Sequence, residues 1–110
     1  MPHTIDSALD DKLVTVLDRH DDMGSFAITI GALDTPVFIE LGRFLTDDRV
    51  KFQVSHSIHT PVQAGPYRTS LPVGDDAGYA LHRAISGLTD YYRQAVQAGH
   101  EPEEAWLVRN

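Results

Sequence analysis

The chain of 110 residues contains no cysteine. Disulfide bonds, thiolate redox chemistry and zinc sites built from cysteine are therefore excluded. Absence of cysteine fits a reducing compartment, where thiols are not used for disulfides. The N-terminal stretch MPHTIDSALDDK also lacks the basic region and following apolar region of a secretory signal. We therefore predict a cytoplasmic protein.

Long apolar runs are missing as well. No stretch of the sequence approaches the roughly 20 residues of a membrane-spanning helix, so no membrane partner is expected. Hydrophobic residues make up 42% of the chain and charged residues 23%, which is typical of an ordinary globular protein and not of a disordered one. A chain of this length can bury one core, and we predict a single α+β domain over residues 1–110.

Basic residues are outnumbered, because nine Lys and Arg stand against 16 Asp and Glu, for a formal net charge of −7. Residues 1–48 carry ten acidic and three basic residues, whereas residues 49–110 carry six of each. This balance opposes binding to phosphate backbones, so nucleic acid is not an expected partner. An alternative hypothesis is an acidic protein that inhibits a DNA-binding partner. It rests on aspartates crowded in the first expected helix, namely Asp6, Asp10, Asp11, Asp18, Asp21 and Asp22.

Motifs of enzymes and metalloproteins are absent too. The sequence has no HExxH, no glycine-rich phosphate loop and no G-x-S-x-G elbow. His56 and His59 are three residues apart on a predicted strand, so their side chains are expected on opposite faces and cannot share a metal ion. Ser55 and Ser57 share a face with His59, but no oxyanion donors accompany them. We expect no catalytic residue, no metal site and no cofactor.

The longest alternating segment, residues 49–60, predicts a central strand. Its alternation places one apolar row toward a core and one polar row toward solvent. The expected inner row is Val50, Phe52, Val54, His56 and Ile58, and the expected outer row is Arg49, Lys51, Gln53, Ser55, Ser57 and His59.

Other periodicities complete the predicted fold. Residues 25–30 and 37–45 alternate as strands, and residues 5–22 and 76–98 carry single amphipathic stripes typical of helices. The expected architecture is an α-β-β-β-α two-layer sandwich, an antiparallel three-stranded sheet packed by two helices. Residues 67–71 can add a short fourth strand at the edge. The tail predicts one further helical turn, with Trp106 and Leu107 folded back on the core.

This element order also occurs in double-stranded-RNA-binding domains. The last helix of such a domain is expected to open with a lysine cluster. Here it opens with DDAGYALHR, and the first helix is acidic. We therefore do not assign the chain to that family.

Two surfaces remain as candidates for binding. If both helices cover one face of the sheet, the other face is flat and moderately polar, with Phe38 exposed, and suits a symmetric dimer or another protein. The loop of residues 61–75, with three prolines and two glycines, is long for a compact domain and is a second candidate.

We therefore predict a small, non-enzymatic binding or interaction module, homodimeric, whose partner is a second copy or another protein. The alternative is a small-ligand-binding or enzymatic domain with a pocket between loop 61–75 and the C-terminal helix. The residues expected to contact the partner or ligand are Arg49, Lys51, His59, Tyr67, Arg68 and His82.

Overall fold

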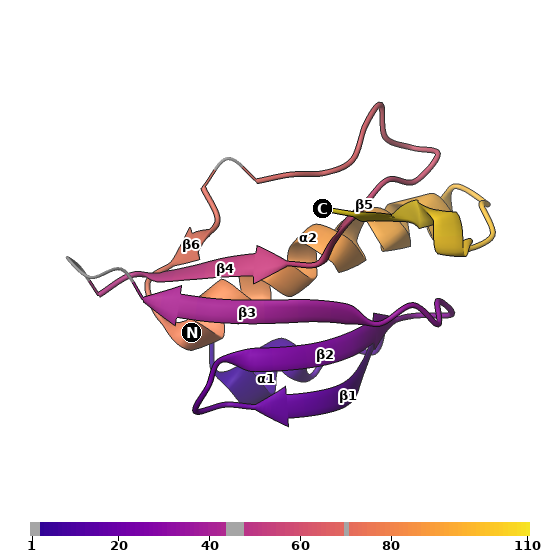
Figure 1. Ribbon diagram of the computed structural model, residues 1–110. Coiled ribbons are helices and arrows are strands. Elements are labelled where there is room, and N and C mark those ends of the chain that lie inside the picture. Colours follow the sequence, from indigo (N-terminus) through magenta and orange to yellow (C-terminus); the bar gives the residue numbers. More distant parts are fainter. Residues whose placement is uncertain (1–2, 44–47, 70) are drawn as a thin grey trace.

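The computed structural model describes every residue except 1–2, 44–47 and 70. Figure 1 shows the course of the chain. Its elements, in order, are α1 (Ile5–Leu9), β1 (Val14–His20), β2 (Ser25–Ile30), β3 (Val37–Arg43), β4 (Val50–Val54), β5 (His56–Ile58), β6 (Val73–Gly74), α2 (Ala77–Gln97), the 3-10 helix η1 (Glu104–Trp106) and β7 (Leu107–Arg109). Neither helix is long and apolar enough to cross a membrane, as far as the described residues go.

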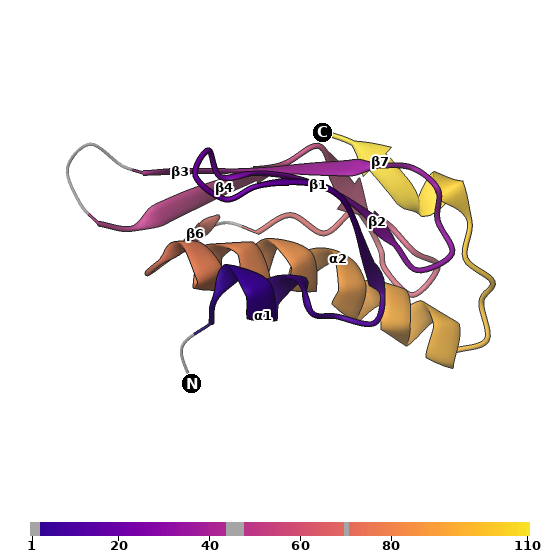
Figure 2. The same cartoon turned by 90° about the horizontal axis from the view of Figure 1, so that it is seen from below.

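The strands form two antiparallel sheets. Five of them make the main sheet in the order β1-β2-β3-β4-β6, and β5 pairs with β7 in a separate two-stranded sheet. Both α1 and α2 lie on the same side of the main sheet, as Figure 2 shows from below. The predicted α+β class and antiparallel sheet are confirmed, but the sheet has five strands in place of the expected three.

The first predicted helix is wrong beyond Leu9. The carboxylate of Asp11 holds a turn by accepting the backbone N–H two residues ahead at 2.9 Å, and β1 then pairs antiparallel with β2. The apolar spacing suits a helix, but three consecutive β-branched residues at 14–16 favour a strand. Gly24, expected to end the helix, instead sits in the β1–β2 turn with φ 67°.

The central strand predicted over residues 49–60 is two strands that belong to different sheets. The break falls at Ser55, which uses its backbone N–H and its Oγ to bond the carbonyl and the N–H of Phe38, each at 2.9 Å. Before the break the alternation holds. After it, His56 is buried as expected, but Ser57 is buried as well and does not face solvent.

Two further predictions need correction near the C-terminal half. The expected edge strand at 67–71 is wrong, because β6 forms at Val73–Gly74 and pairs with the start of β4. The tail contains one turn of 3-10 helix followed by β7, which the sequence did not indicate. Trp106 and Leu107 fold back on the core as predicted.

The core lies between the main sheet and α2. Inward-facing residues of β2 and β3 pack against one stripe of α2, and burial of each such aliphatic side chain contributes roughly 1.5–3 kcal/mol. The fully buried members of this layer include Phe26, Ile28, Ile30, Val37, Ile39 and Leu81. The opposite face of the sheet carries no helix among the described residues, and Phe38 on it is 54% exposed.

Candidate functional site

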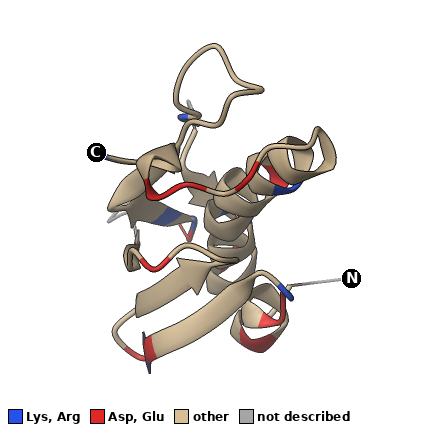
Figure 3. Ribbon diagram, turned by 90° about the vertical axis from the view of Figure 1, so that its right-hand side faces the viewer, with Lys and Arg blue, Asp and Glu red and all other residues tan. Residues whose placement is uncertain are grey.

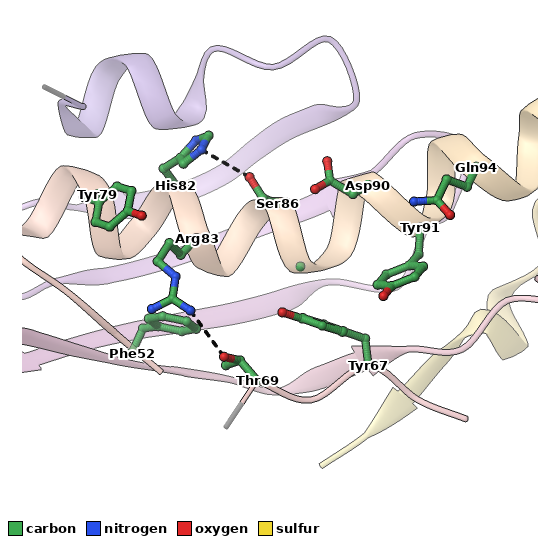
Figure 4. Close-up of a pocket in the computed structure, with 11 residues that line it drawn as sticks. Phe52, Tyr67, Thr69, Tyr79, His82, Arg83, Ser86, Asp90, Tyr91 and Gln94 are labelled. Carbon is green, nitrogen blue, oxygen red and sulfur yellow. Dashed lines mark hydrogen bonds between the residues drawn. The ribbon is translucent and has the colours of Figure 1, made fainter. Parts of the chain in front are cut away.

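A groove runs along the outer side of α2, facing residues 67–69 of the segment between β5 and β6. Figure 4 shows its lining, and its volume is about 300 Å³. The segment contributes Tyr67 and Thr69 as one wall, and β4 contributes Phe52. The other wall and the floor come from α2, chiefly through Tyr79, His82, Ser86, Asp90, Tyr91 and Gln94.

Arg83 fixes the wall formed by Tyr67 and Thr69, the segment wall, to the helix. Its guanidinium donates to the carbonyl oxygens of Leu71, at 2.8 Å, and Val73, and to Thr69 Oγ1 at 3.3 Å. The same group lies 5.8 Å from the centre of the Phe52 ring, a cation–π distance. The planar fork of arginine suits several acceptors at once, which a lysine ammonium does not. The groove is therefore held open by bonds within the protein.

The ring of Tyr67 packs over the helix at Gly87. A Cβ added at position 87 would lie 3.0 Å from Cε2 of Tyr67, so the glycine that interrupts this helix allows the ring to approach. The Tyr67 ring also meets that of Tyr91, with centroids 5.2 Å apart and planes at 42°. The group that this glycine accommodates is therefore a loop tyrosine and not a strand of the sheet.

The backbone near Tyr67 is anchored by hydrogen bonds. The N–H of Tyr67 donates to the carbonyl of Ile58 at 2.9 Å. The Gln63 side chain accepts from the N–H of Thr60 at 2.8 Å and donates to the Ile58 carbonyl at 3.1 Å. A long loop rich in proline and glycine is thereby ordered around one buried polar cluster, and it presents Tyr67 in a defined position.

A stack of rings closes the N-terminal end of the groove. His82 stacks on His3 with centroids 3.9 Å apart, and His3 stacks on Tyr79 at 5.5 Å. Burial lowers the pKa of His82, and the neighbouring His3 adds to this effect, while Asp90 and Asp11 oppose it. The lowered pKa favours a neutral imidazole at pH 7, which suits stacking and hydrogen bonding more than ion pairing.

The groove has one carboxylate open to an incoming ligand. Arg83 and Asp90 are the lining residues with a formal charge, and Arg83 is engaged with the segment wall. The Asp90 side chain is 62% exposed, and its ion-pair partner in the described part of the chain, Arg93, is 3.8 Å away. Because Arg93 is itself bonded to Asp11 at 2.5 Å, it neutralises Asp90 only weakly.

Catalysis by a Ser-His-Asp set does not fit this helix face. His82, Ser86 and Asp90 follow one another at intervals of four, and Ser86 Oγ is 3.5 Å from Nε2 of His82. An orienting aspartate must bond the histidine. Two turns separate Asp90 from His82, which is about 12 Å along the axis. The serine therefore lies between the two groups, and nothing orients the imidazole as a general base.

A second, smaller cavity lies beneath the groove beside His56. Ser55 Oγ is 2.7 Å from Nδ1 of His56. The cavity measures about 40 Å³, close to the roughly 30 Å³ share of one water in the liquid. It is too small for a ligand, so the groove above it is the candidate site.

The structure brings together two of the six predicted site residues. Tyr67 and His82 both line the groove. Arg68 lines a separate hollow of about 250 Å³ beside Ser57 and Asn110. The other three lie elsewhere: Arg49 and Lys51 are exposed at the start of β4, and His59 follows β5.

Several groove residues were not predicted from the sequence. Arg83, Ser86, Asp90 and Tyr91 were not among the residues expected to contact a partner or ligand. The available signal was the glycine at position 87, since a glycine inside a helix costs up to about 1 kcal/mol relative to alanine and calls for a structural reason. This glycine indicates that another group lies close to the helix at position 87, but it does not indicate which group.

The described residues include no group of three or more His, Cys, Asp or Glu side chains placed to hold a metal ion. Comparison with protein-family models, curated proteins and solved structures gives no match to this chain. The chemistry of the groove is therefore the basis on which its function is inferred.

The buried histidines make stability depend on pH. Burial lowers the pKa of His56, helped by Arg109, and the pKa of His82 is lowered as described. Unfolded histidines titrate near 6.5, so below that value the unfolded chain binds more protons than the folded chain, and stability falls as pH falls. We expect the Tm to drop between pH 7.5 and pH 5, measured by circular dichroism.

Variants separate this effect from carboxylate titration. A hydrogen bond from Arg19 lowers the pKa of Asp21, and one from Thr35 lowers the pKa of Glu104. The contributions of these two carboxylates to stability are lost only below about pH 4.5. The double variant His56→Gln, His82→Gln should therefore flatten the Tm profile between pH 7.5 and 5. An unchanged slope in that variant would contradict the assignment.

Proposed function

We propose that the protein is a non-enzymatic binding module that takes an extended segment of a partner protein into the groove between α2 and residues 67–69. The observation that carries this proposal is the preformed wall. Arg83 ties the segment to the helix through three acceptors, so the groove needs no rearrangement before binding. Preorganisation of this kind lowers the entropic cost of association.

The groove also presents the side chains that dominate protein interfaces. Tyr67 and Tyr79 are 37% and 39% exposed, and the ring of Tyr91 on the helix lies beside that of Tyr67 (Figure 4). Tyrosine is enriched among residues that carry most of the binding energy, because it offers a rigid apolar ring together with a hydroxyl. Three tyrosines along one groove therefore support a role in recognition more than in catalysis.

The shape of the groove favours an extended segment over a compact molecule. From Tyr79 to Gln94 the helix rises roughly 22 Å, the length of six or seven extended residues. A volume of about 300 Å³ spread over that length makes a shallow channel, whereas sites for small molecules enclose most of their ligand. A peptide lying along α2 can contact both aromatic ends and the polar floor.

A library of random octapeptides, displayed and selected on the folded protein, tests this proposal. The variant Gly87→Leu fills the floor of the groove. Its Cβ meets only the Tyr67 ring, and loss of a helix-interior glycine stabilises the helix by up to about 1 kcal/mol, so it is expected to fold. Selected peptides should bind this variant at least about 10-fold more weakly, a loss of about 1.4 kcal/mol.

The matched control is Phe38→Ser on the uncovered face of the sheet. It removes an exposed ring of similar size far from α2 and should leave peptide affinity unchanged. Peptides that keep their affinity for Gly87→Leu, or that lose it in Phe38→Ser, would contradict the proposal, as would a library that yields no binder. Circular dichroism of each variant establishes that it is folded.

A second proposal is a weak homodimer through the uncovered sheet face. The observation in its favour is Phe38, exposed on β3. Glu40 lies two residues further along the same strand and Lys51 pairs with Gly42 beyond it, and their opposite charges suit a two-fold contact. Four strands spaced about 4.8 Å apart and some 20 Å long offer roughly 400 Å². A stable interface needs about 800 Å² per partner, so a weak dimer is expected.

Sedimentation equilibrium tests the dimer. The wild-type protein should associate at high micromolar concentration, and Phe38→Ser should not. A wild-type monomer throughout that range would remove the proposal.

The acidic inhibitor of a DNA-binding protein receives no support from this fold. Its aspartates do not form rows on one helix, because α1 ends at Leu9. They lie on α1, in turns and on β1 (Figure 3), and Arg19 pairs with both Asp6 and Asp21.

A further inference from the structure

The charge inside the groove indicates what kind of segment it receives. Asp90 has a carboxylate that is mostly exposed and weakly paired. The guanidinium of Arg83, which also lines the groove, donates its hydrogen bonds to Leu71, Val73 and Thr69. Burial also lowers the pKa of His82, which disfavours a positive charge there. A ligand group beside Asp90 therefore meets a negative charge that Arg93, bonded to Asp11, neutralises only weakly.

The aromatic rings near Asp90 add a second attraction for cations. Tyr91 follows Asp90 on the helix and its ring turns toward Tyr67, while the Asp90 carboxylate points along the helix toward Ser86 (Figure 4). Ammonium and guanidinium groups bind the faces of such rings, with arginine favoured because its planar group also stacks. A carboxylate and tyrosine rings on one stretch of helix suit an arginine or lysine side chain.

The charge of the whole molecule acts in the same direction. A formal net charge of −7 attracts positively charged partners, and such a field raises their encounter rate. Acidic residues also lie on and just after α1, namely Asp6, Asp10 and Asp11, and α1 packs along the side of α2 (Figure 2). Long-range attraction therefore brings basic segments to the surface, and the groove fixes where they bind.

We infer that the groove recognises a basic, extended segment of a partner protein, with an arginine or lysine side chain bonded to Asp90 and packed against Tyr91 and Tyr67. This inference rests on the proposed function and adds the chemistry of the partner. The peptide length follows from the groove, and the basic character follows from Asp90.

Fluorescence anisotropy with labelled octapeptides tests the inference at about 0.15 M salt, where distant charges are screened. The probes alternate glycine with arginine, with glutamate or with serine. We expect the arginine peptide to bind most tightly. Asp90→Lys should weaken it at least about 10-fold, and the control Glu40→Lys, an equal charge change on the opposite face of the sheet, less than about 3-fold.

Other outcomes would overturn the inference. Equal weakening by Asp90→Lys and Glu40→Lys would show attraction to net charge alone. Equal affinity for the glutamate peptide would remove the requirement for a basic partner. Displacement of the arginine peptide by spermidine at the same concentration of positive charge would assign the site to small polyamines and not to a protein segment.

The failure of this inference is distinguishable from failure of the proposed function. One outcome is a set of library peptides that lose their affinity for Gly87→Leu, are non-basic, and bind Asp90→Lys as tightly as the wild-type protein. That outcome would keep the groove as the binding site and contradict only the basic character of the partner. Peptides that ignore Gly87→Leu remove both.

Discussion

Alanine at Gly31 is expected to lower the free energy of unfolding by about 2–5 kcal/mol. Gly31 has φ 53°, and an alanine Cβ would lie 2.3 Å from Oη of Tyr92. The left-handed backbone costs a non-glycine residue roughly 1–2 kcal/mol, and overpacking adds roughly 1–3 kcal/mol. Tyr92 is buried and its hydroxyl accepts the N–H of Ala32 at 3.0 Å, so it cannot move without losing that bond. Urea denaturation measures the change.

Two other glycines serve as controls that separate the backbone cost from the steric cost. Gly99 has φ 94° with no atom within 4 Å of an added Cβ, and Gly65 has neither a left-handed φ nor a neighbour. Gly99→Ala should therefore cost about 1 kcal/mol, and Gly65→Ala less than about 0.5 kcal/mol. If Gly31→Ala costs no more than Gly99→Ala, the contact with Tyr92 does not constrain the fold.

Replacing Arg83 by alanine is expected to release the wall of the groove while the helix stays folded. The variant loses hydrogen bonds to the carbonyls of Leu71 and Val73, and hydrogen bonds from a charged group contribute roughly 1.5–3 kcal/mol. Amide exchange in residues 67–73 should accelerate by about 10- to 100-fold, since each 1.4 kcal/mol is a factor of ten. Hydrogen exchange read by mass spectrometry measures it, and selected peptides should lose their affinity.

The controls for Arg83 are Arg83→Lys and Arg93→Ala. Lysine keeps the charge but cannot satisfy several carbonyls in one plane, so exchange should rise to an intermediate level. Arg93 lies on the same helix and pairs with Asp11 away from the segment wall, so its loss should leave exchange at residues 67–73 unchanged. Acceleration in Arg93→Ala equal to that in Arg83→Ala would contradict the role given to Arg83.

Much of the sheet was predictable because its strands carry their own signal. Residues 25–30 alternate apolar and polar side chains, and the structure has β2 there; β3 and β4 were likewise predicted. The long helix was predicted within about one residue at each end, since its apolar stripe continues for five turns. These patterns are local, so neighbouring residues are sufficient to specify them.

Other elements depended on contacts that the sequence does not display. β1 was mistaken for helix because Leu9, Leu13 and Val16 match a helical spacing, and only pairing with β2 decides between the two structures. β5 and β7 are about fifty residues apart in the sequence, and His56 pairs with Arg109, so the break at Ser55 has no local signature. Tertiary pairing overrode the local pattern in both places.

The groove could be predicted only in part for the same reason. A pocket between loop 61–75 and the last helix was expected, lined by Tyr67, Arg68, His59 and His82. A groove is present there, and of these four residues Tyr67 and His82 line it. The decisive contacts join residues far apart in sequence, such as the Arg83 bonds to the segment wall and the Tyr67 ring over Gly87. No periodicity encodes them, because each depends on how an irregular loop folds back.

The central claim, that the groove along α2 binds a peptide, is tested most directly by titrating ¹⁵N-labelled protein with a selected octapeptide and following amide chemical shifts. We predict that the shifts concentrate in residues 79–94 of α2 and residues 67–69 of the facing segment. Shifts concentrated instead on the uncovered sheet face, at residues 38–40 and 51–53, would contradict the account and place binding on the opposite side of the molecule.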